Sequence, residues 1–274
     1  MRCMYFIPIF IIFFVSPISW AGNATSFNIL DKRLIVYGGV QRYEAKGEFS
    51  STKEGRPTVN IDLDDLGLDE NEVTPVFGLK YKISKRWNMR LDYYGYHEDE
   101  TRTADFEFNF EDLIVPVGAR VDTSIDVDIY VANLSYDIVH SRNARFGLGI
   151  GAHVADLDLE ISGKVTSNET EVPLGEGHEE LLAPLPNLYA TGSYAITDNF
   201  LFRCGGGWIS LSYDDYDGEL IFANAFLEYW PFRHAGFGLG YRYVEADIDY
   251  DSGKKVEKYD IQLPGPLAYV VFGF

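Results

Sequence analysis

Apolar and polar residues alternate along most of the chain. In the segment from Trp87 to Tyr96, apolar side chains occupy positions 87, 89, 91 and 93, and polar ones occupy 88, 90 and 92. Successive side chains of a β-strand point to opposite faces, so this period of two predicts a strand with one apolar and one charged face. The same pattern recurs in ten segments: 33–43, 75–83, 87–98, 130–138, 145–155, 186–196, 199–211, 219–230, 235–246 and 267–274.

Short and long connections alternate between these segments. The short ones, at 84–86, 141–143, 197–199 and 231–234, are basic or turn-like. The long ones, at 46–73, 98–124, 158–185, 214–218 and 247–257, are rich in acidic residues. Such lopsided lengths are typical of membrane barrels, whose turns are short on one side and loops long on the other.

A soluble β-sandwich or lipocalin-like barrel is the main alternative, because alternation alone does not exclude it. Large aromatic residues near the strand ends, such as Trp87 and Tyr136, suit the interfaces of a lipid bilayer, and the opposite faces hold charges and glycines that suit a polar lumen. We therefore predict an all-β fold, a transmembrane antiparallel up-and-down β-barrel. An unpaired edge is too costly in hydrocarbon, so the first strand should pair with the last. We expect ten strands, or eight if 186–196 or 219–230 is irregular.

The first 21 residues have the anatomy of a secretory signal peptide. Arg2 is followed by an apolar run from Met4 to Val15, then by a breaker at Pro17 and the small-x-small triplet 19–21. The run is shorter than the roughly 20 apolar residues of a spanning helix, so we expect cleavage after Ala21; cleavage after Ala24 and an uncleaved anchor are the alternatives. Residues 22–274 would then form a single barrel domain with Cys204 as its one cysteine and no intramolecular disulfide.

Three features carry a resemblance: the leader, the alternation and the carboxyl-terminal phenylalanine. In these the sequence resembles small bacterial outer-membrane β-barrels, akin to the membrane domains of OmpA and OmpW. The resemblance implies the outer membrane of a Gram-negative bacterium, with outer-membrane lipid and lipopolysaccharide as surroundings. It also implies that the barrel-assembly machinery reads the last strand, in which Val270, Phe272 and Phe274 form the assembly signal. The resemblance is architectural, covers essentially the whole mature chain and indicates no ligand.

The alternation also predicts which titratable side chains point into the lumen: Lys80, Lys82, Arg90, Asp92, Asp137, His153, Arg203, Glu228 and Arg242. A barrel this narrow has little room beyond its own side chains. The first interpretation is therefore a charge-paired plug. A narrow aqueous path gated by the same ion pairs and a ligand-specific lumen are the alternatives.

The formal net charge of -19 is carried mainly by the long connections. This acidity argues against nucleic acid as a partner. Carboxylate clusters are the ligands that hard cations prefer, so divalent cations that bridge to lipopolysaccharide phosphates are candidate partners, with solvated like charges as the alternative. In the second connection Phe106, Phe108 and Phe110 alternate with acidic residues, which indicates that the flanking strands continue above the membrane. No cofactor is expected.

Known barrel enzymes offer a limited test for catalysis. Omptin-like proteases carry an Asp-x-His pair and lipid A deacylases a His-x-Ser pair, and none of the five histidines has either spacing; Glu176 and His178 come closest. We therefore predict a non-enzymatic surface protein with a structural, adhesion or receptor role through its acidic loops. A narrow porin-like diffusion channel is the second hypothesis, and a hydrolase acting at the barrel rim is the third.

Overall fold

The computed structural model describes residues 28–44, 46–53, 59–62, 72–104, 108–110, 113–167, 170–213, 216–251, 253 and 255–274. The predicted signal peptide lies outside these ranges. Within them, none of the helical structure is long and apolar enough to span a membrane.

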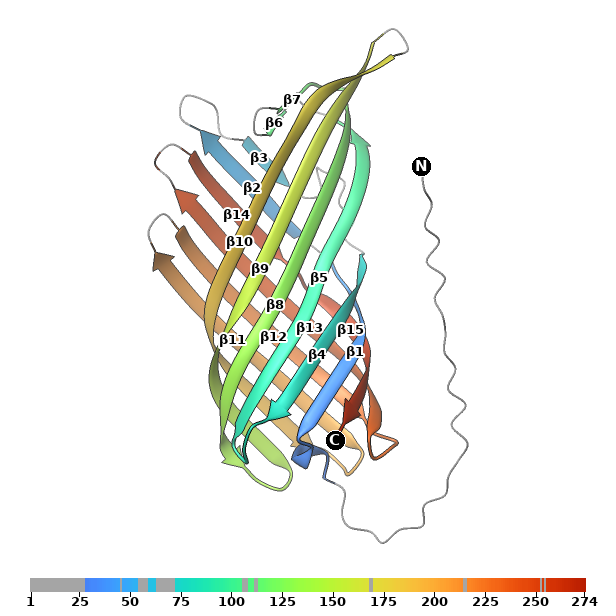
Figure 1. The fold of residues 1–274 in the computed structure, drawn as a ribbon, viewed down its shortest axis with the longest axis vertical. Helices are drawn as coiled ribbons and strands as arrows, with labels where there is room; N and C mark the ends of the chain where they lie inside the picture. Colours follow the sequence, from blue (N-terminus) through green and yellow to red (C-terminus); the bar gives the residue numbers. More distant parts are fainter. Residues whose placement is uncertain are drawn as a thin grey trace.

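Ten antiparallel strands close into a barrel (Figure 1). In order around the ring they are β1 (Leu34–Arg42), β4 (Val73–Lys82), β5 (Trp87–Thr103), β8 (Arg120–His140), β9 (Ala144–Ser167), β10 (Thr170–Ala195), β11 (Phe200–Tyr213), β12 (Tyr216–Tyr229), β13 (Ala235–Asp251) and β15 (Gly265–Gly273). The first and last strands pair, with Ile35 opposite Gly273, as predicted. The count of ten is confirmed, and both segments on which a count of eight depended lie in regular strands.

The strands run far into the ranges predicted as long connections. β5 continues to Thr103, β8 begins at Arg120, and β9 and β10 extend to Ser167 and Thr170. The prediction of loops at 98–124 and 158–185 is therefore wrong for most of these residues, whereas the predicted continuation of the flanking strands is confirmed. Phe106 and the side chains of Phe108 and Phe110 lie outside the described residues. We call the end with the short turns the lower end and the opposite end the upper end, as drawn in Figure 1.

Five short strands and one helical turn complete the described structure. β2 (Lys46–Lys53), β3 (Val59–Asp62) and β14 (Lys255–Gln262) extend the sheet beside the upper half of β13. β6 (Phe108–Phe110) and β7 (Leu113–Val115) form a separate hairpin at the upper end, and the 3-10 helix η1 (Ile29–Asp31) precedes β1 at the lower end.

Two seams divide the upper part of the ring. β10 pairs with β9 along its whole length but with β11 only from Leu188 downward. Likewise β5 pairs with β8 up to Thr103 but with β4 only up to Tyr94. Above these points β5, β8, β9 and β10 form one sheet, and β11 to β14 with β2 and β3 form another.

The polarity of the two faces inverts along the strands. In the lower part of β8, Asn133 and Asp137 point inward while Leu134 is exposed, whereas in the upper part Ile125 is buried while Asp126 is exposed. β9 inverts in the same way, and Leu157, Leu159 and Ile161 are buried there. A polar interior within an apolar exterior suits lipid, and the reverse suits water. The inversion therefore marks the upper limit of the lipid-facing zone.

Candidate functional site

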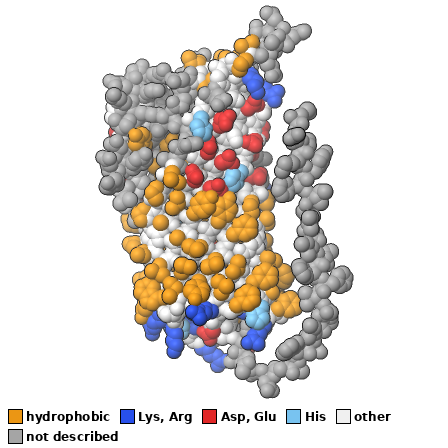
Figure 2. All heavy atoms as spheres, viewed as in Figure 1, with side chains coloured by type: hydrophobic (Ala, Val, Ile, Leu, Met, Phe, Trp, Pro, Cys, Tyr) orange, Lys and Arg blue, Asp and Glu red, His pale blue; other side chains and the backbone are white. Residues whose placement is uncertain are grey.

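An apolar belt crosses the lower half of the barrel on the face that Figure 2 shows, and exposed apolar side chains lie on each of the ten strands of the ring. Aromatic pairs lie near its two limits, Trp87 with Tyr136 and Tyr93 with Tyr130, each with ring centroids 5.3 Å apart. The exposed side chains of the belt include Phe77, Leu91, Leu134, Ile138, Phe146, Leu148, Ile150, Leu188, Tyr194, Phe202, Trp208, Leu227, Tyr229, Phe237, Leu239, Tyr241, Val270, Phe272 and Phe274. Such a belt with aromatic borders is the exterior that a bilayer-spanning barrel requires.

Inside the belt, the predicted lumen residues form several contacts. Arg90 Nε lies 2.6 Å from Asp92 Oδ2. Tyr37 donates to the other oxygen of Asp92 at 2.5 Å, and Arg90 donates to the Tyr37 hydroxyl at 3.4 Å. The sequence prediction of lumen residues included only Lys, Arg, Asp, Glu and His, so it missed Tyr37, although Tyr37 lies at an inward position of β1.

Glu228 is the centre of a second cluster and is fully buried. Arg203 Nε lies 3.1 Å from Glu228 Oε1, and Tyr269 donates to the same oxygen at 2.9 Å. Trp230 Nε1 donates to Oε2 at 3.0 Å. Three groups from three strands or turns therefore hold one carboxylate, which explains how a charge is tolerated in this interior.

Two further predicted residues lie higher in the lumen. Arg242 donates to Gln41 Oε1 at 3.0 Å and lies over the ring of Tyr94, with 4.0 Å between the guanidinium carbon and the centroid. His153 is buried and contacts the side chain of Asn187 at 3.0 Å. These groups mark the top of the polar zone, directly below the apolar upper core.

The remaining predicted residues lie lower in the lumen. Asp137 Oδ2 is 3.8 Å from His140 Nδ1, and Lys82 donates to the carbonyl of Leu30 in η1. Lys80 has no hydrogen bond or ion pair with any residue that the structure describes, although it points into the same interior. The structure thus brings eight of the nine predicted residues into contact with named partners and leaves Lys80 facing a cavity.

The lower mouth is closed by η1. Ile29 and Leu30 are buried, and Trp230 at the same end of the barrel is fully buried. Lys32, which follows η1, donates to the carbonyls of Gly273 and Arg233 and lies 4.9 Å from the centre of the Trp230 ring. The amino-terminal turn therefore caps the lumen from the short-turn side.

The upper mouth is closed by an apolar core. Leu113 and Val115 of β7 are buried with side chains of the long strands, and a β-carbon at Gly163 would contact Val115. The core also contains Tyr96, Val121, Ile125, Val127, Ile129, Leu157, Leu159, Ile161, Leu220, Val244, Ile248 and Tyr259. Two cavities of about 20 Å³ each lie in the lumen below this core. Each has room for about one water molecule.

Inward glycines make room for tyrosine rings. A β-carbon at Gly78 would overlap the ring of Tyr37, and one at Gly238 would overlap the ring of Tyr269. Both tyrosines donate to lumen carboxylates. The bare backbone at these positions therefore allows the hydroxyls to reach Asp92 and Glu228.

Two histidine–aspartate pairs lie on the outer face above the belt, where Figure 2 shows acidic side chains. His97 Nε2 is 3.2 Å from Asp128 Oδ1, and His178 Nδ1 is 3.2 Å from Asp158 Oδ1. Sequence reasoning missed both pairs because it compared residues two apart in the chain, whereas these partners come from different strands. The side chain of Glu176, the residue whose spacing to His178 comes closest to a catalytic pair, lies outside the described residues.

Carboxylates face each other across neighbouring strands of the other upper sheet, formed by β12, β13, β14 and β2. In the pairing register, Glu219 lies opposite Asp247, Asp247 opposite Asp260, and Asp260 opposite Glu48. Partial burial, together with the nearby charges of Asp260 and Glu245, raises the pKa of Asp247. Among the described residues, no group of three or more potential ligands is arranged to hold a metal ion. Much of the first acidic connection, including Asp64 and Asp65, lies outside those residues.

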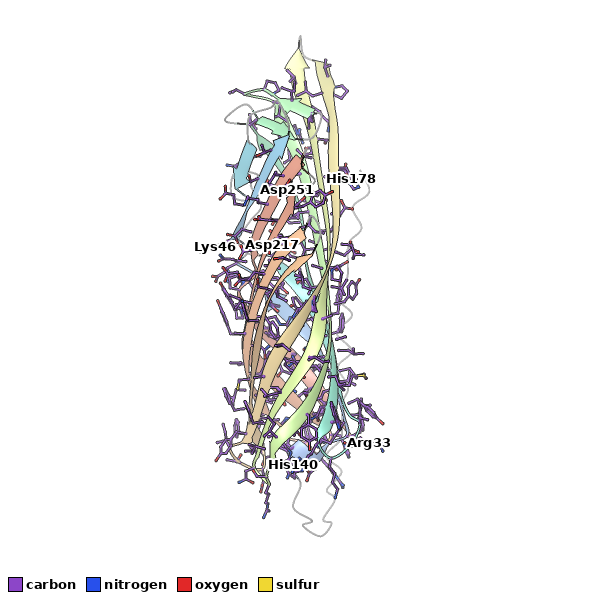
Figure 3. The ribbon with its side chains drawn as sticks, turned by 90° about the vertical axis from the view of Figure 1, so that its left-hand side faces the viewer. Arg33, Lys46, His140, His178, Asp217 and Asp251 are labelled. Atoms are coloured by element: carbon purple, nitrogen blue, oxygen red, sulfur yellow. The ribbon has the colours of Figure 1, made fainter. Side chains whose placement is uncertain are left out.

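The lower rim is basic. Arg33 and His140 lie there, while Asp217, Asp251 and His178 lie toward the upper end (Figure 3). Lys85, Arg86, Arg142 and Arg233 belong to the turns of the lower rim or flank them and are exposed. The molecule therefore carries opposite charges at the two borders of its apolar belt.

No family model and no curated protein matches the chain. Among solved structures, the outer-membrane protease OmpT from Escherichia coli has a TM-score of 0.52 and 10% identity over 88% of this chain and 97% of its own. The outer-membrane protein AlkL has a TM-score of 0.41 and 10% identity, over 92% and 95% of the two chains. A FadL homologue from Pseudomonas aeruginosa has a TM-score of 0.37 and 9% identity, over 89% and 90%.

The likeness to OmpT shows the fold. The chain has the fold of bacterial outer-membrane β-barrels, as the resemblance of its sequence predicted. This class and the apolar belt together support a location in the outer membrane. An identity of 10% transfers no activity from the protease to this chain.

Proposed function

We propose that this protein is a closed outer-membrane barrel, exported by the leader of residues 1–21, with a non-enzymatic structural, adhesion or receptor role at the cell surface. The observation that carries the proposal is the closure of the lumen at three levels: η1 below, the ion-paired cluster in the middle and the apolar core above. The part left for interaction is the acidic outer face of the upper half.

Planar-bilayer conductance tests the closed lumen against the porin-like hypothesis. The refolded mature chain should give no reproducible single-channel steps. The double variant Arg203→Ala with Glu228→Ala, which removes one pair of the middle level, should also give no steps, because η1 and the apolar core still close the lumen. Regular steps from the wild-type protein that shift on Arg90→Gln or Glu228→Gln would establish a channel instead.

A surface role through acidic strands predicts basic partners. Binding of the barrel in lipid nanodiscs to a cationic peptide such as polylysine should weaken steeply with added salt. Substitution of Asp247 and Asp260 by Asn should weaken it further, while Lys85→Gln at the opposite rim should not. Equal binding of the peptide by all variants would show that the acidic face is not the binding surface.

The two His–Asp pairs favour a rim hydrolase as a second candidate, since a carboxylate can orient an imidazole base. Among the described side chains, however, Ser124 Oγ donates to Asp99 at 2.5 Å and not to either histidine. Purified protein would have to turn over lipid A or basic peptides, with turnover lost on His97→Ala or His178→Ala. Absence of turnover on both substrates supports the non-enzymatic role.

A further inference from the structure

One of the two lumen cavities lies among three cationic side chains. Lys80, Arg90 and Arg203 line this cavity of about 20 Å³, between β4, β5 and β11. The other lining side chains are mainly hydroxyl and carboxamide groups, including Ser135, Ser193 and Asn224. No carboxylate of the described residues lines it. Ammonium, guanidinium, hydroxyl and amide groups in one cavity are donors to an anion.

The charges around the cavity are incompletely balanced. Arg90 and Arg203 have carboxylate partners, Asp92 and Glu228, but neither carboxylate lines the cavity. Lys80 lacks an ion-pair partner within the described chain, and Asp137 of the same lower lumen lies 3.8 Å from His140 Nδ1.

The composition of the lumen agrees with this imbalance. The nine predicted lumen residues comprise five lysines or arginines, three carboxylates and one histidine. A buried charge without a counter-charge is strongly unfavourable. A counter-ion in the cavity removes that cost.

We propose that the cavity binds one small monovalent anion, of the class of chloride, held by Lys80 and Arg203 with the hydroxyls of Ser135 and Ser193. The volume admits an ion about as large as one water molecule and excludes sulfate or phosphate. The anion would complete the charge balance of the plug.

The second cavity provides an internal comparison. It has the same volume of about 20 Å³, but Asp92 lines it together with Arg90, Arg242 and His153. A carboxylate in the lining disfavours an anion, so this cavity should hold water. Two neighbouring cavities of equal size should therefore hold different occupants, an anion in one and water in the other, because only the second has a carboxylate in its lining.

Crystals of the mature protein soaked in bromide test the site directly. An anomalous peak is expected between Lys80 and Arg203 and not in the second cavity. The peak should persist in Lys85→Gln, which changes an exposed lysine of a lower turn, and disappear in Lys80→Gln. Absence of a peak in the wild type, or an undiminished peak in Lys80→Gln, would overturn the proposal.

Thermal unfolding gives a second readout in solution. At fixed ionic strength, replacing gluconate by chloride should raise the unfolding midpoint of the wild type and of Lys85→Gln in a saturable manner. The rise should vanish in Lys80→Gln. Should that variant not refold, Ser193→Ala must shift the chloride dependence to higher concentration. Equal midpoints of the wild type in both salts would contradict anion binding.

Discussion

Glu228 illustrates how single residues hold the plug together. It is fully buried and contacts Arg203, Trp230 and Tyr269. Removal of one partner of a buried ion pair leaves the other charge uncompensated and costs roughly 3–5 kcal/mol. We therefore expect Glu228→Gln to lower the free energy of unfolding, measured by urea titration in detergent micelles, by about this amount.

The matched control is the double variant Arg203→Met with Glu228→Gln. Because it removes both charges, it should recover a substantial part of the loss. The half-buried Glu219→Gln, which keeps an acceptor oxygen for Trp208 and loses only the charge, should cost about 1 kcal/mol or less. A single Glu228 variant as stable as the wild type would show that the cluster does not stabilise the barrel.

Asp247 gives the upper sheet a pH dependence of defined sign. Its folded-state pKa is raised, so its carboxylate form is disfavoured by folding. Stability from this group is present below the unfolded pKa and is lost as the pH rises through the folded pKa. Asp247→Asn should therefore raise the thermal unfolding midpoint at pH 7 and have little effect at pH 3.

Asp122 is the control of opposite sign. Hydrogen bonds from Lys164 and Thr101 lower its pKa, so its stabilisation is present above the unfolded pKa and is lost as the pH falls through the folded pKa. Asp122→Asn should lower the midpoint at pH 7 and have little effect at acid pH. Changes of the same sign in the two variants would argue against this electrostatic explanation.

The alternation of inward and outward positions along the chain was sufficient to predict which face of the sheet a side chain points to. It was not sufficient to predict which residues that side chain contacts. The faces of Arg90, Asp92 and Glu228 follow from the period of two alone. The contacts of Asp92 with Tyr37 and of His97 with Asp128 depend on the register between strands, which alternation does not specify. β5 and β8 are joined by the long second connection, so no short turn fixes the register that brings His97 opposite Asp126 and close to Asp128.

Among the elements, β10 shows how proline can set the limit of a seam. Pro184 and Pro186 keep their places in the register with β9, while pairing with β11 ends at Leu188. Proline cannot donate to a ladder, so it is tolerated where a strand has no neighbour on that side. Pro186→Ala should change the free energy of unfolding by less than about 1 kcal/mol.

Ala190 has the same parity on β10 but lies within the paired region, opposite Gly206. Ala190→Pro should remove a ladder hydrogen bond inside the belt, where an unsatisfied backbone group costs several kcal/mol. The two variants are compared by urea unfolding in micelles. Similar stabilities would mean that the register between β10 and β11 does not support the barrel.

The sequence predicted elements within the belt better than those above it. From 87 to 98 the apolar face meets lipid, so the strand was recognised by its membrane character. From 158 to 161 the alternation is equally regular, but acidic residues take the outward positions and the range is predicted as part of a long connection. The helical turn η1 and the β6–β7 hairpin are too short to carry a periodic signal.

At the scale of the whole molecule, the closed ring and the inverted polarity of its two faces follow from two environments of the same strands, lipid in the lower half and water in the upper half. Lipid requires a closed ring with a polar lumen, and water permits two separate sheets with an apolar core between them. The strands pass from one regime to the other without a break in β8 and β9. Long strands therefore join the plug to the surface of the upper half as one unit.

The acidic upper end and the basic lower rim can be used to test the orientation of the barrel in the membrane. With the start of β1 and the end of β15 on the side of the short turns, that side should face the periplasm, as in barrels with an even number of strands. In a Cys204→Ala background, a membrane-impermeant maleimide added to intact cells should label Asp217→Cys at the acidic end. It should not label Lys85→Cys at the basic turn until the cells are lysed. Labelling of Lys85→Cys alone in intact cells would reverse the orientation and transfer the surface role from the acidic sheets to the basic rim.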